Sequence, residues 1–285
     1  MTAAAENMGL VDLGEWIRPL RAIFFDASGV LKNAYGLLPG VADRLRELTE
    51  RQIPYWVITN DCSASPAHIA QKMRPASGPP VVEEHQIVCP GMLLTEELRI
   101  RHTGQRIAYL GGEASAFYLK AATCIPVPVT ELDALADVGA FAVMDGNGFD
   151  WQIGLTQAVN VLRHGPAIPL YAPNPDQIYL REEDRINIAP GSLATLIEAI
   201  VGRPFLRLGK PDQAIFQYAL LRAQRQIPDL QPQQVAMVGD SLTTDVTGAR
   251  ACGLRTLLVL SGITTAAAAL NAPAHLRPDA VARSV

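Results

Sequence analysis

The sequence predicts an α/β fold in which a mostly parallel, doubly wound sheet is covered by helices on both faces. Two observations predict it. Short apolar runs alternate with helical patterns along most of the chain, and several of these runs end directly in polar or acidic residues. Strands buried in parallel sheets are continuously apolar, and open α/β folds place their chemistry at the carboxyl ends of such strands. We therefore look for function at the residues that follow each run.

Seven apolar runs are expected to form buried strands. They are residues 22–25, 55–59, 106–110, 140–144, 168–172, 235–240 and 255–260. Between them, segments 39–51 and 190–202 carry apolar residues at helical spacing, and Gly202 is placed to end the second helix. Residues 74–80, rich in proline and glycine, are expected to form an exposed loop.

Composition excludes several classes of function. The 285 residues are 49% hydrophobic and 18% charged, which indicates a globular protein with one large or two moderate domains. A net charge of −4 and scattered arginines argue against a nucleic-acid partner. The four cysteines lie far apart, which suggests neither a zinc site nor a disulfide framework and favours the cytoplasm. The first residues, "MTAAAENMGL", have neither a cationic start nor an apolar core, so we expect no export signal, and no apolar stretch approaches the ~18 residues of a membrane span.

The stretch "FFDASGVL", residues 24–31, places Asp26 directly after an apolar run, and Gly29 then allows a turn. A buried parallel strand would deliver this carboxylate to the carboxyl edge of the sheet. Ser28 stands two residues later, where a phosphoryl-transfer site of this shape would usually carry a second acid.

Thr59 and Asn60 follow the second run directly, and the chain then enters a predicted helix near Pro66. A hydroxyl and free backbone N–H groups at such a point suit a phosphate oxygen, although turn chemistry is the alternative. Lys210 lies at a strand-to-helix junction in a chain that has only three other lysines, at 32, 72 and 120. A specific role for this ammonium competes with that of an ordinary solvated lysine.

The strongest signal is "VAMVGDSLTTDVTGARACGL", in which an apolar run leads into Asp240, with Asp245 near the start of a helix. Carboxylates five residues apart across a tight turn can face one point, as a hard divalent cation requires. Alternatively, Asp240 caps the turn and Asp245 caps the helix. Asp26 would supply a third carboxylate at the same edge, which favours a metal site.

These four motifs, in this order, resemble the haloacid dehalogenase superfamily, in particular its Mg²⁺-dependent aspartyl-phosphate phosphatases. The resemblance covers nearly the whole chain. It implies that Asp26 is the nucleophile, that Thr59 and Lys210 contact the phosphoryl oxygens, and that Asp240 and Asp245 form the acidic metal motif.

The insertion between the second and third motifs resembles the class IIA cap of p-nitrophenyl phosphatases, pyridoxal phosphate phosphatase and predicted sugar phosphatases. We therefore expect a Rossmann-like core of residues 1–89 and 205–285 and an α/β cap of residues 90–204. Cap-to-cap homodimers are common among the proteins it resembles, so a homodimer through the cap is one expectation.

The resemblance also implies a mechanism. Asp26 attacks phosphorus, and Mg²⁺ is held by Asp26, the backbone carbonyl of Ser28 and the acidic motif with Asp240 and Asp245. Ser28 stands where the family's phosphatases carry an acid–base Asp, which puts in doubt a contribution of about 10²–10⁴ to the rate. Three interpretations stay open: a phosphatase of a small phosphorylated metabolite, another hydrolase of the superfamily, and a catalytically weak or silent phosphometabolite-binding protein.

The predicted substrate contacts are Thr59, Asn60 and Lys210 in the core and Asp145 and Asn147 in the cap. The cap residues lie in a glycine-rich loop after an apolar run, from which they can reach the leaving group. Ordinary turn chemistry is an equal alternative for "DGNG" and for the later "PNPD". The sequence does not specify the substrate.

Overall fold

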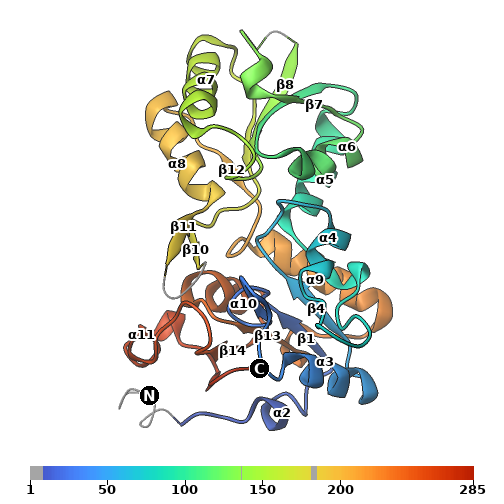
Figure 1. Cartoon of the computed structure of the whole chain (residues 1–285). Helices are drawn as coiled ribbons and strands as arrows, with labels where there is room; N and C mark the ends of the chain where they lie inside the picture. The colour runs from blue at the N-terminus through green and yellow to red at the C-terminus, as the bar shows by residue number, and fades with distance from the viewer. Residues whose placement is uncertain (1–8, 136, 181–184) are drawn as a thin grey trace.

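The computed structural model describes residues 9–135, 137–180 and 185–285. Part of the N-terminal segment in which we expected no export signal, residues 1–8, lies outside them. The chain forms two lobes that each contain a parallel sheet, drawn one above the other in Figure 1. Within the described residues, no helix is both long and apolar enough to cross a membrane.

The lower lobe in Figure 1 contains a six-stranded sheet in the order β15-β14-β13-β1-β4-β5, and every neighbouring pair is parallel. Its strands are β1 Ala22–Phe25, β4 Tyr55–Ile58, β5 Ile87–Val88, β13 Val235–Gly239, β14 Arg255–Val259 and β15 Ala280–Ala282. All residues of β1, β4 and β13 are buried, as expected for central strands of a sheet covered on both faces. The predicted doubly wound α/β fold is confirmed.

Helices cover this sheet on both faces. They are α2 Leu13–Trp16, α3 Val41–Glu50, α4 Pro66–Gln71, α9 Gln213–Gln226, α10 Thr247–Ala251 and α11 Ala266–Leu270. Successive side chains of a strand point to opposite faces, and β1 shows the result. Ile23 and Phe25 pack in the cluster that contains the α3 side chains, whereas Phe24 packs with Trp56 in the cluster that contains the α9 side chains.

The upper lobe contains a five-stranded parallel sheet in the order β12-β9-β8-β6-β7. Its strands are β6 Arg106–Leu110, β7 Ile125–Pro128, β8 Val138–Val143, β9 Leu170–Ala172 and β12 Leu206–Arg207. Its helices are α5 Pro90–Arg101, α6 Phe117–Ala121, α7 Trp151–His164 and α8 Pro190–Val201. In Figure 1, α7 and α8 lie on one side of this sheet, and α5 and α6 lie on the other.

All seven predicted strands and both predicted helices are present, and Gly202 ends α8 in the left-handed conformation with φ 70°. Among the strands of the two parallel sheets, the prediction missed β5, β7, β12 and β15. Strands β5 and β12 have two residues each, and the edge strand β7 contains two prolines, which weaken a strand pattern.

Two antiparallel hairpins and several single turns complete the described structure. The hairpins are β2 Lys32–Asn33 with β3 Gly36–Leu37 and β10 Ile178–Leu180 with β11 Ile186–Ile188. The turns are η1 Glu84–Gln86, η2 Glu113–Ala116, η3 Val129–Glu131, η4 Pro232–Gln234, η5 Leu242–Val246 and η6 Ala274–Leu276. The carboxyl ends of β1, β4 and β13 meet the loops that follow β8, β9 and β12. The two sheets therefore approach each other at their carboxyl edges, where open α/β folds place their functional residues.

Candidate active site

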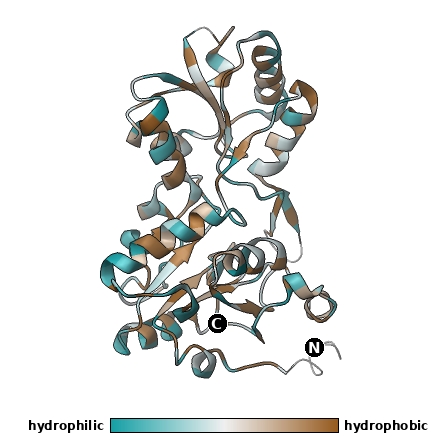
Figure 2. Cartoon of the chain, turned by 180° about the vertical axis from the view of Figure 1, so that it is seen from behind, coloured by the Kyte–Doolittle hydropathy of each residue, from teal (hydrophilic) through white to brown (hydrophobic). Residues whose placement is uncertain are grey.

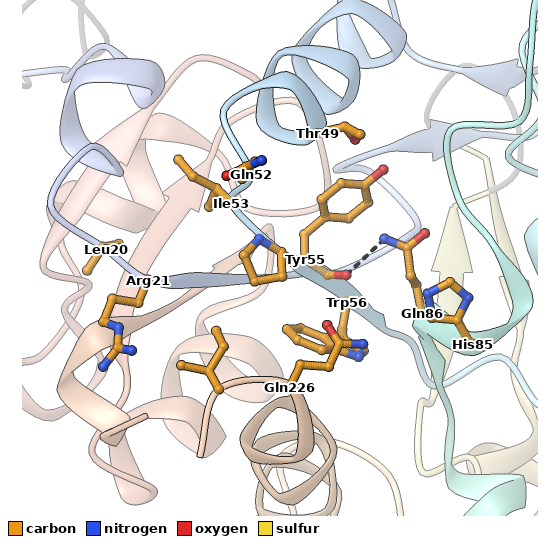
Figure 3. A pocket seen from close by; sticks show the side chains of 12 residues that line it. Leu20, Arg21, Thr49, Gln52, Ile53, Tyr55, Trp56, His85, Gln86 and Gln226 are labelled. Atoms are coloured by element: carbon orange, nitrogen blue, oxygen red, sulfur yellow. Dashed lines mark hydrogen bonds between the residues drawn. The ribbon is translucent and has the colours of Figure 1, made fainter. Parts of the chain in front are cut away.

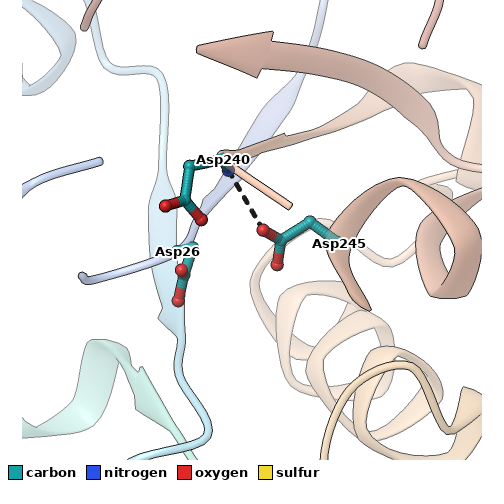
Figure 4. A group of neighbouring side chains, drawn as sticks. All are labelled: Asp26, Asp240 and Asp245. Atoms are coloured by element: carbon teal, nitrogen blue, oxygen red, sulfur yellow. Dashed lines mark hydrogen bonds between the residues drawn. The ribbon is translucent and has the colours of Figure 1, made fainter. Parts of the chain in front are cut away.

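Three aspartates converge at the carboxyl edge of the core sheet. Asp26 follows β1 directly, and Asp240 follows the neighbouring strand β13, so the sheet order brings both side chains together. Asp245 returns to the same point from turn η5. One carboxylate oxygen of each residue lies within 4.8 Å of the others, and Figure 4 shows the three groups facing one space. The structure therefore brings together all three predicted acids.

Lys210 completes this cluster. Its Nζ lies 2.7 Å from Oδ1 of Asp26 and 2.7 Å from Oδ1 of Asp245, and its side chain is only 3% exposed. Burial alone would lower the pKa of this lysine, but the two carboxylates outweigh it and raise the pKa above its ordinary value. The ammonium therefore stays charged, and it bridges the predicted nucleophile and the acidic motif.

Asp245 is held in place by three donors. Its Oδ2 accepts hydrogen bonds from the backbone N–H groups of Asp240 and Ser241, at 3.1 Å each, and its Oδ1 receives Lys210. Gly239 makes this close approach possible, because a Cβ there would lie 2.3 Å from Cβ of Asp245. The strand end needs glycine so that the carboxylate can fold back over it.

Asp240 sits in a cradle of glycines. Its Oδ2 accepts a hydrogen bond of 2.8 Å from the backbone N–H of Ile263. A Cβ on Gly262 would lie 1.8 Å from this oxygen, and one on Gly29 would lie 2.3 Å from it. The turn after β1 and the loop after β14 therefore both fix the position of this carboxylate.

Burial and crowding make it costly for these acids to be ionised together, a cost that a bound cation would offset. Burial, reinforced by Asp26 and Asp245, raises the pKa of Asp240 to about 8. Burial also raises the pKa of Asp26 to about 6, although Lys210 opposes it. Three converging carboxylates are hard oxygen ligands, so the donor set fits a divalent cation such as Mg²⁺.

Thr59 and Asn60 follow β4, the strand next to β1, and both are buried. The Thr59 hydroxyl accepts a hydrogen bond from the Asp61 N–H at 3.2 Å. The Asn60 amide is fully engaged by the protein. Its Oδ1 accepts a hydrogen bond from the Lys210 N–H, and its Nδ2 donates both to the Lys210 carbonyl and to Asp176. The structure thus places Asn60, a predicted substrate contact, as a link to Lys210.

Ser28 is exposed and lies in the turn after Asp26, next to Gly29 with φ 79°. A β-bridge joins it to Lys32, whose half-buried side chain has a pKa lowered by burial, with Asp61 opposing the shift. Lys72 pairs with Asp61 at 3.0 Å. The sequence analysis did not assign Lys32 or Lys72, although the scarcity of lysine in this chain was a usable signal.

The cap loop that carries Asp145 and Asn147 faces the core loop after β4. The Asn147 amide donates to Oδ1 of Asp145 at 3.2 Å, and burial together with the charge of Asp61 raises the pKa of Asp145. Asn147 itself is exposed. Within the described residues, the structure joins this loop to Asp61 and Cys62 of the core and shows no hydrogen bond from either side chain to the three aspartates or Lys210.

Three contacts seat the cap on the loop after β4. They are the Asn60 amide on Asp176 at 2.7 Å, the Cys62 thiol on the Met144 carbonyl at 3.7 Å and the Tyr118 hydroxyl on the Ala64 carbonyl at 2.7 Å. Sequence analysis considered Asp176 only as a turn residue of "PNPD" or a leaving-group contact. Its position four residues after the apolar run 168–172 was the signal that could have marked it.

A separate hollow of about 640 Å³ lies at the opposite, amino-terminal end of the core strands, as Figure 3 shows. Residues before β1, β4 and β5 line it, and Gln86 donates there to the Tyr55 carbonyl at 3.1 Å. None of the three converging aspartates lines this hollow. This hollow is therefore separate from the acidic cluster at the carboxyl edge of the sheet.

This fold and site define a hydrolase with a parallel α/β core whose acidic cluster lies under an inserted α/β cap. Comparison with known proteins makes the class more specific. Residues 23–124 match the family "Haloacid dehalogenase-like hydrolase", and residues 207–285 match a related HAD-hydrolase-like family. The glycerol-3-phosphate phosphatase of Mus musculus is 30% identical over 268 residues, which cover 85% of this chain and 79% of that protein.

Solved structures agree. A possible sugar phosphatase of the HAD superfamily from Cytophaga hutchinsonii superposes with a TM-score of 0.91 at 34% identity, over 98% of each chain. A glycerol phosphate phosphatase from Mycobacterium tuberculosis, in complex with magnesium, gives a TM-score of 0.76 at 23% identity, over 93% of this chain and 75% of that one, and this likeness shows the fold alone. The chain therefore belongs to the haloacid dehalogenase-like hydrolases, among the phosphoric monoester hydrolases with a class IIA cap.

Proposed function

We propose that this enzyme is a Mg²⁺-dependent phosphatase of a small phosphorylated metabolite, such as a sugar phosphate, and that it works through an aspartyl phosphate on Asp26. One observation carries the proposal: Asp26, Asp240 and Asp245 converge on one space while Lys210 bridges two of them. The names of the relatives, a glycerol-3-phosphate phosphatase and a possible sugar phosphatase, support the substrate class.

In this proposal, Asp26, Asp240, Asp245 and the backbone carbonyl of Ser28 hold Mg²⁺. The magnesium in the mycobacterial structure and the donor set of this chain support the assignment. When bound, the ion supplies positive charge that offsets the charge of the transferring phosphoryl group.

The residues of the chain then have distinct tasks. The Asp26 carboxylate attacks phosphorus, the bond to the leaving-group oxygen breaks, and that oxygen departs with its electron pair. Lys210 and the Thr59 hydroxyl stabilise the phosphoryl oxygens. Water next attacks the phosphorus of the aspartyl phosphate, which releases inorganic phosphate and restores Asp26.

Ser28 distinguishes this chain from the family's usual phosphatases. A hydroxyl at this position does not supply a carboxylic acid to protonate the leaving group or a carboxylate to activate water. Both steps therefore proceed with little acid–base assistance, which is worth about 10²–10⁴ in rate where it operates. Activated substrates with good leaving groups should be favoured.

We propose that residues 90–204 act as a cap over a core of residues 1–89 and 205–285, and that Asp145 and Asn147 contact the leaving group. Exposed apolar side chains on β10 and β11, strands that are partly brown in Figure 2, support a homodimer through the cap. The free thiols of all four cysteines support a cytoplasmic setting.

The test is turnover of a broad phosphoester panel with and without Mg²⁺, on the parent and on Asp26→Asn. Asp43→Asn, which changes an exposed acid on α3, is the matched control. We expect Mg²⁺-dependent turnover that falls by several orders of magnitude, roughly 10³-fold or more, in Asp26→Asn and is kept in Asp43→Asn. Activity of Asp26→Asn near the parent level would show that another site performs the reaction.

Ser28 favours a second candidate, a phosphometabolite-binding protein with little or no turnover. In that case, phosphorylated metabolites would stabilise the protein against heat in the presence of Mg²⁺, but no phosphate would be released. Turnover of phosphonate or haloacid substrates, without turnover of phosphoesters, would instead indicate another hydrolase of the superfamily.

A further inference from the structure

Lys210 reaches the active site from the cap. The chain leaves the cap sheet through β12 and arrives at Lys210 three residues after that strand ends. Strand β12 pairs with β9, and the chain beyond β9 carries Asp176. Neighbouring parallel strands of the cap therefore deliver Lys210 and a half-buried acid to the same edge of the core.

The Asn60 side chain joins these two elements to the core. Its Oδ1 accepts the backbone N–H of Lys210 at 2.8 Å, and its Nδ2 donates to the Lys210 carbonyl at 3.1 Å. The second hydrogen of Nδ2 goes to Oδ1 of Asp176 at 2.7 Å. One amide thus clamps both backbone polar groups of Lys210, and an acid from the cap orients that amide.

A carboxylate is well suited to this orienting role. An ionised carboxylate only accepts hydrogen bonds, so it selects the amide orientation in which Nδ2 faces Asp176 and Oδ1 remains for the Lys210 N–H. The opposite orientation would set the amide oxygen against both Asp176 and the Lys210 carbonyl. Hydrogen bonds to an ionised acceptor are also the stronger ones, which agrees with the shorter distance to Asp176.

The cap holds Asp176 rigidly. Its N–H donates to Oδ1 of Asn174 at 2.9 Å, and its carbonyl accepts the N–H of Gly191 at the start of α8. Close packing continues into the core, because a Cβ on Gly209 would lie 2.6 Å from Cδ of Pro175 and 2.5 Å from Oδ1 of Asn60. Asp176 therefore links the cap to the residues around Lys210.

We propose that Asp176 is a positioning residue that acts through Asn60: it fixes the backbone of Lys210 and thereby keeps the lysine ammonium between Asp26 and Asp245. The inference rests on the proposed phosphatase function for its kinetic consequence. Its structural consequence, the position of Lys210, is independent of turnover.

The kinetic test compares Asp176→Ala and Asp176→Asn with the parent, using p-nitrophenyl phosphate and Mg²⁺. Asp133→Ala, which removes an exposed acid of the cap, is the matched control. We expect kcat to fall about tenfold or more in Asp176→Ala, because a small displacement of a catalytic group is costly. Asp176→Asn keeps an acceptor oxygen and should retain kcat within about threefold. The control should match the parent.

A double-mutant cycle separates positioning from simple stabilisation. If Asp176 acts through Asn60, Asp176→Ala should cost nothing further in an Asn60→Ala background. Equal losses in both backgrounds would overturn the proposal. So would a variant with a lowered melting temperature and parent kcat, because that result describes a structural role alone.

A crystal structure of Asp176→Ala decides the inference even if the parent has no phosphatase turnover, the result that would defeat the proposed function. We expect Lys210 Nζ to lie beyond hydrogen-bond distance of Asp26, Asp245 or both. A lysine that still bridges the two carboxylates would overturn the inference and leave the proposed function untouched.

Discussion

Replacing Gly262 by alanine tests the geometry of the metal site without removing any of its ligands. Gly262 lies in the half-buried loop after β14, and its backbone does not need the left-handed conformation, so alanine fits the main chain. The added Cβ would lie 1.8 Å from Oδ2 and 2.5 Å from Cβ and Cγ of Asp240. The substitution therefore acts on one carboxylate.

The size of the effect follows from these distances. Cβ atoms do not approach other heavy atoms closer than 3.0 Å, so Asp240 and the new methyl group must separate by about 1.2 Å, the difference between 3.0 Å and 1.8 Å. This movement also breaks the 2.8 Å hydrogen bond from the Ile263 N–H. A misplacement of about 1 Å in a catalytic site costs on the order of 10² in rate. We expect kcat/KM for p-nitrophenyl phosphate to fall by about that factor.

The assay measures turnover across a Mg²⁺ titration together with the Mg²⁺-dependent rise in melting temperature. The apparent Mg²⁺ affinity should weaken in Gly262→Ala. Gly9→Ala is the control, because a Cβ on Gly9 meets nothing within 4 Å. Parent-like turnover and Mg²⁺ affinity in Gly262→Ala would refute the argument that this glycine holds Asp240 in position.

Three further predictions concern the acids and Ser28. Asp240→Asn should abolish Mg²⁺-dependent turnover and reduce stabilisation by Mg²⁺, and unchanged Mg²⁺ affinity in a calorimetric titration would contradict the assignment. Ser28→Asp should raise turnover of alkyl phosphates by about 10²-fold or more and make the rate depend less on the pKa of the leaving group. The role given to Ser28 would be contradicted if the parent hydrolyses sugar phosphates as fast as p-nitrophenyl phosphate and the substitution lowers both rates. Without Mg²⁺, the raised pKa values of Asp26 (about 6) and Asp240 (about 8) contribute stability below the unfolded value of 3.8 that is lost as pH rises through the folded values. Parent melting temperatures between pH 4 and pH 8 should therefore fall more than those of Asp240→Asn, and equal falls would contradict the prediction.

The heart of the site was predictable because Asp26 and Asp240 directly follow apolar runs. To predict that Asp26 and Asp240 lie at the same edge, only the rule that parallel strands share a carboxyl edge was needed. The observed sheet order makes the two residues neighbours. The partner of each residue was harder to predict. The sequence suggested Asp245 as a metal ligand, whereas the structure shows that its oxygens also receive Lys210 and two backbone N–H groups.

Other features carried too little local signal. Strands β5 and β12 are too short for a periodic pattern, and their pairing depends on neighbours far away in the chain. The contact between Asn60 and Asp176 joins residues 116 positions apart. Both residues are typical of turns, so only the meeting of the two lobes distinguishes this pair from ordinary turn chemistry.

The most direct test of the account is to trap the phosphorylated enzyme. The parent is mixed with Mg²⁺ and phosphorus-labelled p-nitrophenyl phosphate, quenched in acid during turnover and digested for mass spectrometry. We predict an acyl phosphate, removable by hydroxylamine, on the peptide that contains Asp26, and we predict that it accumulates because Ser28 gives little help to its hydrolysis. Steady turnover with no label on that peptide, or with label on another residue, would contradict the assignment of Asp26 as the nucleophile.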